Sequence, residues 1–187
     1  MTLIALAVAA LAAGTPPVTD PVLTEMVALY DDLCLKAFPD DGAIDRAVAA
    51  RSPTVLSPDQ VRIYLHDDPG RGWWIDDANG RFVITIEAPP YHACSVRRLT
   101  DSGFTDMTAY STRLASYSAS HPGYTQMAPM DMDIGDIHSH ATGVQRALTN
   151  GGSDTLFMFE NRPATVSKSK TGVEIRFVRQ LASPEAH

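Results

Sequence analysis

The first regular segment of the chain is marked by apolar positions at helical spacing after Asp20. These positions recur every three or four residues and are Val22, Met26, Leu29, Tyr30 and Leu33. Asp20 can cap a helix with its carboxylate, Pro21 suits the first helical position, and Pro39 ends the pattern. The sequence therefore predicts a helix from Pro21 that ends before Pro39. A second, shorter helix is predicted over residues 44–51, with Asp41 as its candidate cap.

A hairpin is predicted around Asn79-Gly80, a dipeptide that accepts the positive φ angles of a two-residue turn. If Ala78 lies opposite Arg81, apolar residues meet on one face of the two strands. The predicted apolar pairs are Ile75 with Ile84 and Trp73 with Ile86. Trp74 then lies on the other face.

Most of the remaining pattern predicts strands, with one further helix between about Phe104 and His121. Strands are predicted over residues 61–65, 94–99, 124–134, 137–148 and 155–160, and in a last pair that flanks residues 170–172. In that last pair, the expected partners are Lys168 with Val173, Val166 with Ile175 and Ala164 with Phe177. The order of elements favours an α+β fold, an antiparallel sheet with helices packed on one face. Residues 20–187 are expected to form a single domain.

An apolar run at the start of the chain predicts export. Residues 3–13 are all apolar or small, and Gly14-Thr15-Pro16-Pro17 follows them. Such a run is shorter than a membrane span and matches the core of a signal peptide, although no Lys or Arg precedes it. An ordinary buried helix is the alternative. We take residues 1–14 as a signal peptide, which gives a periplasmic or secreted protein without a membrane span after cleavage.

The charge and the cysteines narrow the class of protein. The 15 Lys and Arg against 22 Asp and Glu give a net charge of -7, which argues against a nucleic-acid partner. In an oxidising compartment, the only two cysteines, Cys34 and Cys94, are most simply a disulfide. A CxxC redox site or a zinc site fits less well, because the two cysteines are sixty positions apart.

Four segments carry a family resemblance: Cys34 with Ala37-Phe38-Pro39, Gly72-Trp73-Trp74, residues 94–100 and residues 172–180. Together they resemble a family of small exported proteins from alphaproteobacteria. The resemblance covers most of the chain after residue 20. It implies export and the cysteine pairing, but no activity and no site residues, because the family has none assigned.

A stretch rich in methionine and histidine is the candidate metal site. It contains Met127, Met130, Met132, His138 and His140, and thioether and imidazole groups are ligands that Cu(I) accepts. In a strand, Met130 and Met132 share one face, and His138 and His140 also share a face. The alternative is methionines in the core and histidines on the surface, with no cofactor. The neighbouring Asp131, Asp133 and Asp136 do not follow the spacing of a calcium loop.

Two further features bear on ligand binding. Trp74, on the face away from the predicted core, marks a ligand or partner surface unless a helix or loop covers it. Arg97, Arg98, Arg176 and Arg179 form either an anion-binding patch or a solubilising surface.

The sequence therefore favours a binding module without a reaction centre, with a small molecule or an envelope protein as its partner. Its candidate ligand surface comprises Trp74, His138 and His140. Copper handling is the first alternative. The second is a small hydrolase whose Ser/His/Asp triad leaves no sequence motif.

Overall fold

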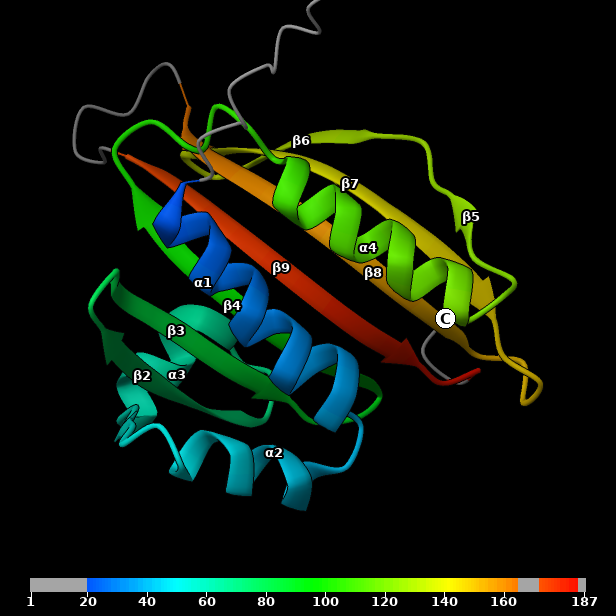
Figure 1. The fold of residues 1–187 in the computed structure, drawn as a ribbon, viewed down its shortest axis with the longest axis horizontal. Helices are drawn as coiled ribbons and strands as arrows, with labels where there is room; N and C mark the ends of the chain where they lie inside the picture. Colours follow the sequence, from blue (N-terminus) through cyan, green and yellow to red (C-terminus); the bar gives the residue numbers. More distant parts are fainter. Residues whose placement is uncertain (1–19, 165–171, 185–187) are drawn as a thin grey trace, which may run out of the picture.

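The computed structural model describes residues 20–164 and 172–184, and these residues form one antiparallel sheet with helices against it (Figure 1). The strands follow the order β1-β2-β3-β4-β9-β8-β7-β5, and β6 also pairs with β7. This confirms the predicted α+β class with an antiparallel sheet. No helix in the described ranges is both long and apolar enough to cross a membrane. The predicted signal peptide, residues 1–14, lies outside these ranges.

Most of the segments predicted as strands are strands in the structure. Their bounds are β1 (Thr54–Val55), β2 (Gly70–Asp77), β3 (Gly80–Glu87), β4 (Tyr91–Thr100), β5 (Thr125–Gln126), β6 (Met130–Ile134), β7 (Ile137–Ala147), β8 (Ser153–Pro163) and β9 (Val173–Ala182). The segment predicted as one strand over residues 124–134 is therefore two strands, β5 and β6.

The helices lie mainly on one face of the sheet, which we call the helix face. They are α1 (Pro21–Tyr30) with its π-helical continuation η1 (Asp31–Ala37), α2 (Asp41–Ala49), α3 (Pro58–Leu65) and α4 (Thr108–Ser120). Figure 1 shows α1 and α4 side by side on the sheet, both running roughly along the strands. As predicted, Asp20 caps α1, accepting from the backbone N–H of Val22 at 2.8 Å. The cap of α2 is Asp40 rather than Asp41.

Helix α3 replaces the strand predicted over residues 61–65, and that prediction is wrong. Ser57 accepts from the backbone of Gln60, and Gln60 accepts in return from the backbone of Ser57, which makes a capping box in front of Pro58. The alternating pattern is misleading because Ile63 is 71% exposed and does not belong to the core cluster of the described residues. In strand β2, a side chain at position 70 would lie on the face of the sheet away from the helix face. Leu65 of α3 occupies that position beside Gly70. Helix α3 therefore lies on the opposite face, which we call the open face.

In the β2–β3 hairpin, the side chains lie on the predicted faces of the sheet. The predicted register between the two strands is wrong by two residues. Asp77 pairs with Gly80, so the turn residues are Ala78 and Asn79. The Asp77 carboxylate fixes this turn by accepting from the backbone N–H groups of Asn79 and Gly80, at 2.6 and 3.0 Å.

The register predicted for the last hairpin is also wrong. Phe177 of β9 lies opposite Met158 rather than Ala164, and Ile175 lies opposite Glu160. Strand β8 ends at Pro163, before the residues predicted to pair with β9, and its residues from Ser153 to Asn161 pair with β9 instead. Val166 and Lys168, the other two residues of the predicted pairs, lie outside the described residues.

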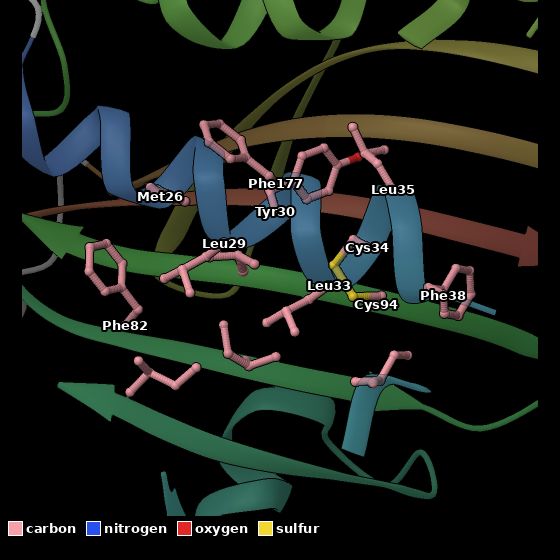
Figure 2. Packing of buried hydrophobic residues seen from close by; sticks show 14 of the residues in the cluster. Met26, Leu29, Tyr30, Leu33, Cys34, Leu35, Phe38, Phe82, Cys94 and Phe177 are labelled. Atoms are coloured by element: carbon pink, nitrogen blue, oxygen red, sulfur yellow. A yellow bond between two sulfur atoms is a disulfide. The ribbon is translucent and has the colours of Figure 1, made fainter. Parts of the chain in front are cut away.

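The hydrophobic core fills the space between the helix face and the helices. Figure 2 shows Leu29, Tyr30 and Leu33 from α1 and η1 packed over Phe82 and Phe177 from the sheet. The Cys34–Cys94 disulfide joins η1 to β4 inside this core, and both cysteines are fully buried. The predicted cysteine pairing is confirmed, and it attaches the first helix to the sheet.

A buried ion pair holds the end of η1 against the sheet. Arg179 of β9 donates to both carboxylate oxygens of Asp154 on β8, at 3.1 and 3.0 Å. Its third nitrogen donates to the carbonyl oxygens of Cys34, Leu35 and Phe38, at 3.3, 3.4 and 3.0 Å. The guanidinium thus provides donors for carbonyl groups at the helix end, which lack partners within the helix.

Candidate functional site

A pocket of about 370 Å³ opens on the open face of the sheet, beside Trp74. Its wall combines aromatic, cationic and apolar side chains with one carboxylate, and includes Tyr64, Trp74, Arg81, Val83, Arg97 and Glu174. They come from α3 and from strands β2, β3, β4 and β9, so distant parts of the sequence build the pocket. Its volume lies in the range of sites for small molecules.

Arg97 is the buried cation of this pocket. Its side chain is 4% exposed, and one nitrogen donates to Thr85 Oγ1 at 3.3 Å and to Ser95 Oγ at 3.2 Å. Its Nε atom is buried and has no hydrogen-bond partner, and no carboxylate forms an ion pair with it in the described part of the chain. A buried charge is normally paired, because its desolvation is costly. Arg97 therefore has no carboxylate in direct contact among the described residues, and Glu174 is the carboxylate that shares the pocket with it.

The surroundings of Arg97 disfavour its charge without removing it. Burial, followed by the neighbouring Arg176, lowers the pKa of Arg97 to about 9. Arg176 lies directly opposite Arg97 on β9, and burial also lowers its pKa. Glu174 and Glu87 act in the other direction by Coulomb attraction. At neutral pH Arg97 is still protonated, so an added anion would be attracted to it.

Two aromatic rings stand beside this cation. The ring of Tyr64 meets Trp74 edge to face, with 5.9 Å between centroids, and the Arg97 guanidinium lies 4.9 Å from the Tyr64 centroid. Arg81 lies 5.3 Å from the Trp74 ring and pairs with Asp76 across the hairpin. Cations over aromatic rings are attracted to them, and these contacts hold the side chains in place. The pocket therefore brings aromatic surfaces and cationic groups together.

The structure separates the four arginines that the sequence grouped as one patch. Arg97 and Arg176 share the open face, whereas Arg179 lies on the helix face in its ion pair with Asp154. Arg98 donates to the carbonyl oxygen of Arg81 at 2.7 Å. A solubilising surface is the wrong interpretation for Arg97 and Arg179, which are 4% and 6% exposed.

The three residues of the predicted ligand surface do not come together. Trp74 is half-buried on the open face of β2, while His138 and His140 lie on the helix face of β7. Five strand spacings separate β2 from β7, which is about 24 Å. Each histidine instead meets a carboxylate of β6: His138 Nδ1 lies 2.9 Å from Asp133, and His140 Nδ1 lies 2.8 Å from Asp131.

The methionines and histidines of the candidate copper site are on opposite faces of the sheet. Met130 lies opposite Ala141 and Met132 opposite Ser139, so their side chains point to the open face. Met127 lies between β5 and β6. His138 and His140 point to the helix face, so their imidazoles cannot share a metal ion with the thioethers of Met130 and Met132. Within the described ranges, no group of three or more His, Cys, Asp or Glu side chains is placed to hold a metal ion.

The histidines of the described residues do not form the triad that a hydrolase needs. Ser120 Oγ lies 3.1 Å from His121 Nδ1, but that same nitrogen lies 3.0 Å from the carbonyl oxygen of Tyr117. The imidazole also stacks on the Tyr117 ring, with 4.1 Å between centroids. This contact caps the end of α4, and no carboxylate of the described residues is hydrogen-bonded to the ring as a triad requires.

Several residues of the pocket carry no signal of a site in the sequence, among them Tyr64 and Glu174. The alternating pattern places Tyr64 on a strand, and only the capping box at Ser57 and Gln60 indicates a helix there. Glu174, which accepts from Asn161 at 2.9 Å, gave no signal because its place beside Arg97 follows from the pairing of β4 with β9. In comparisons with known proteins, no family model, no curated protein and no solved structure matches this chain.

Proposed function

We propose that this protein is an exported binding protein that takes up a small organic anion in the pocket beside Trp74. The ligand would carry a carboxylate or a similar acidic group next to a flat apolar body. The acidic group would lie near Arg97, and the apolar body would lie against Trp74 and the exposed side chain of Leu99 at the rim.

One observation carries the proposal: Arg97 is a buried cation that forms no ion pair within the described residues, and it lines a pocket with aromatic walls. An anion supplied by a ligand would neutralise this charge in a site of low polarity, where the interaction is stronger than in water. Glu174 also lines the pocket, and it would weaken the binding of ligands with several negative charges. A monoanion fits best.

The proposed export rests on two features. The apolar run over residues 3–13 has the length of a signal-peptide core, and the buried Cys34–Cys94 disulfide is typical of proteins from oxidising compartments. Mass spectrometry of the protein recovered from the periplasm of an expression host tests this point. Cleavage close to residue 14 supports export, and an intact N-terminus in the cytosol contradicts it.

Four ligands that share one aromatic body but differ in charge test the binding proposal. Phenylacetate is the anion, phenylalanine the zwitterion, phenylacetamide the neutral analogue and phenethylamine the cation. Isothermal titration calorimetry should give the tightest binding for phenylacetate and no measurable binding for phenethylamine. Equal affinity for phenylacetate and phenylacetamide would contradict a role for the Arg97 charge.

Two variants connect such binding to the pocket. We expect Arg97→Gln and Trp74→Ala each to weaken phenylacetate binding about ten-fold or more, because each removes on the order of 1.4 kcal/mol or more of interaction. Arg62→Gln, which changes an exposed arginine of α3, is the matched control and should bind normally. Thermal unfolding of each variant separates lost binding from lost folding. Because Trp74 is only half-buried, Trp74→Ala remains informative even if Arg97→Gln does not fold.

A further inference from the structure

A second hollow lies on the helix face, between α4 and strand β7. Its volume is about 380 Å³, and Leu114 and Ala115 of α4 lie across it from Val144 of β7 and Met158 of β8. Gln126 of β5 forms part of its rim. We call this hollow the α4 groove. In Figure 1, α4 runs along β7 and β8, with the β5–β6 segment at the outer edge of the sheet.

The α4 groove contains two polar groups that lack partners. Tyr110 is 5% exposed, and its buried hydroxyl oxygen has no hydrogen-bond partner among the described residues. The Ser118 hydroxyl, two turns further along α4, is also buried and has no partner in the same part of the chain. Leaving a buried hydroxyl unpaired is costly, so such groups are expected to have a partner when the protein is in its working state.

Stacking against the core fixes the position of Tyr110. Its ring stacks on Phe177 at 4.1 Å between centroids and lies 6.2 Å from the ring of Tyr30. The ring therefore cannot easily move its hydroxyl oxygen toward another partner. Burial raises the pKa of Tyr110, so the group stays protonated and can act only as a neutral donor or acceptor.

The side chains along the α4 groove decide the chemistry of its occupant. Within the described residues, the lining contains no Asp, Glu, Lys, Arg or His. An ionic ligand would lose its hydration there without gaining a partner of opposite charge. An apolar molecule with an acceptor oxygen would bury its hydrocarbon part and accept hydrogen bonds from Tyr110 and Ser118.

From these observations we infer that the α4 groove is a second binding site, for a neutral and mainly apolar small molecule that carries a carbonyl or ether oxygen. The site is separate from the pocket beside Trp74, because the two lie on opposite faces of the sheet. It does not depend on the anion-binding proposal.

The probe 6-propionyl-2-dimethylaminonaphthalene tests this inference. It is neutral and apolar, carries one ketone oxygen, and its fluorescence shifts to shorter wavelength in an apolar site. The wild-type protein should bind it saturably with such a shift. Tyr110→Phe keeps the stacked ring but removes the donor, and should weaken binding about five-fold, the effect of one lost hydrogen bond. The same variant should unfold at an equal or higher temperature than wild type, because it removes an unpaired buried hydroxyl.

A blocking variant makes the test specific. Ala115 lines the α4 groove but is exposed, so Ala115→Phe should fill the groove without disturbing the core and abolish binding. Ser116→Phe places the same ring on another exposed face of α4 and should bind the probe normally. Unchanged binding in Ala115→Phe, or displacement of the probe by phenylacetate, would overturn the inference. A probe that does not bind wild type would overturn it as well.

Discussion

Replacing Arg179 with methionine tests the buried ion pair that holds η1 on the sheet. Arg179→Met keeps an unbranched apolar stem but removes the guanidinium nitrogens of Arg179 that donate to Asp154 and to the carbonyl groups at the end of η1. Asp154 is fully buried, so its carboxylate would lose its bidentate partner in a site without access to water.

The structure sets the size of the expected effect. Removal of one partner from a buried ion pair costs about 3–5 kcal/mol of stability. Arg146 still donates to Asp154 at 2.9 Å in the variant, which favours the lower end of that range. The carbonyl oxygen of Phe38 loses its 3.0 Å bond, and an unpaired buried acceptor costs about 1–3 kcal/mol. Because these costs overlap, we expect a loss of about 3–4 kcal/mol, a large fraction of the stability of a typical domain.

Urea unfolding, followed by tryptophan fluorescence and by far-UV circular dichroism, measures this loss. Arg162→Met is the matched control, since Arg162 pairs with Glu160 in an exposed position on β8 and should contribute under about 1 kcal/mol. A double-mutant cycle with Asp154→Asn should show that the two residues are coupled. If Arg179→Met costs no more than Arg162→Met, the ion pair does not hold η1 and this reasoning is refuted.

Two further predictions concern the same part of the molecule. The Cys34→Ala/Cys94→Ala double variant should lose about 4 kcal/mol in urea unfolding, because the disulfide closes a loop between residues 60 positions apart, and the reduced wild type should behave similarly. A reduced protein as stable as the oxidised one would contradict this. Burial opposes the ionisation of Asp154, but the guanidinium of Arg179 outweighs it and holds the pKa of Asp154 below its usual value. The unfolded chain therefore binds the proton first, so this stabilisation is present above about pH 4 and is lost as the pH falls through the lower native pKa. Urea titrations from pH 7 down to pH 2 should show that the free energy of unfolding declines less for Asp154→Asn than for wild type. Equal declines would contradict a lowered pKa of Asp154 in the folded protein.

Local signals in the sequence predicted the framework of the fold. The Asp20-Pro21 cap and the apolar stripe after it gave the first helix, and the two cysteines gave the disulfide. These predictions succeeded because their physical causes lie within a few residues or in the cysteine count. Helix α3 was missed because its alternating apolar residues are partly exposed, and Ile63 contributes nothing to a core. The Ser57 and Gln60 capping signal was the stronger evidence there.

The candidate site was predictable only in part. Trp74 is predictable as a surface residue because two adjacent tryptophans in a strand must point to opposite faces. The structure places it at a pocket. The burial of Arg97 and Arg179 was not predictable, since a charged residue in a strand is usually exposed. Arg97 is buried because it lies between β3 and β9 and under the ring of Tyr64 from α3. These contacts depend on the order of the strands in the whole sheet, which the local sequence does not show.

The most direct test of anion binding observes Arg97 itself. Its Nε–H group has no hydrogen-bond acceptor within the described residues, and an arriving carboxylate would change its surroundings more than those of any exposed arginine. In ¹H–¹⁵N NMR spectra, the Arg97 Nε–Hε signal, identified by its absence in Arg97→Lys, should shift progressively as phenylacetate is added and stay in place with phenylacetamide. An Arg97 signal that does not move at saturating phenylacetate would contradict the proposed site.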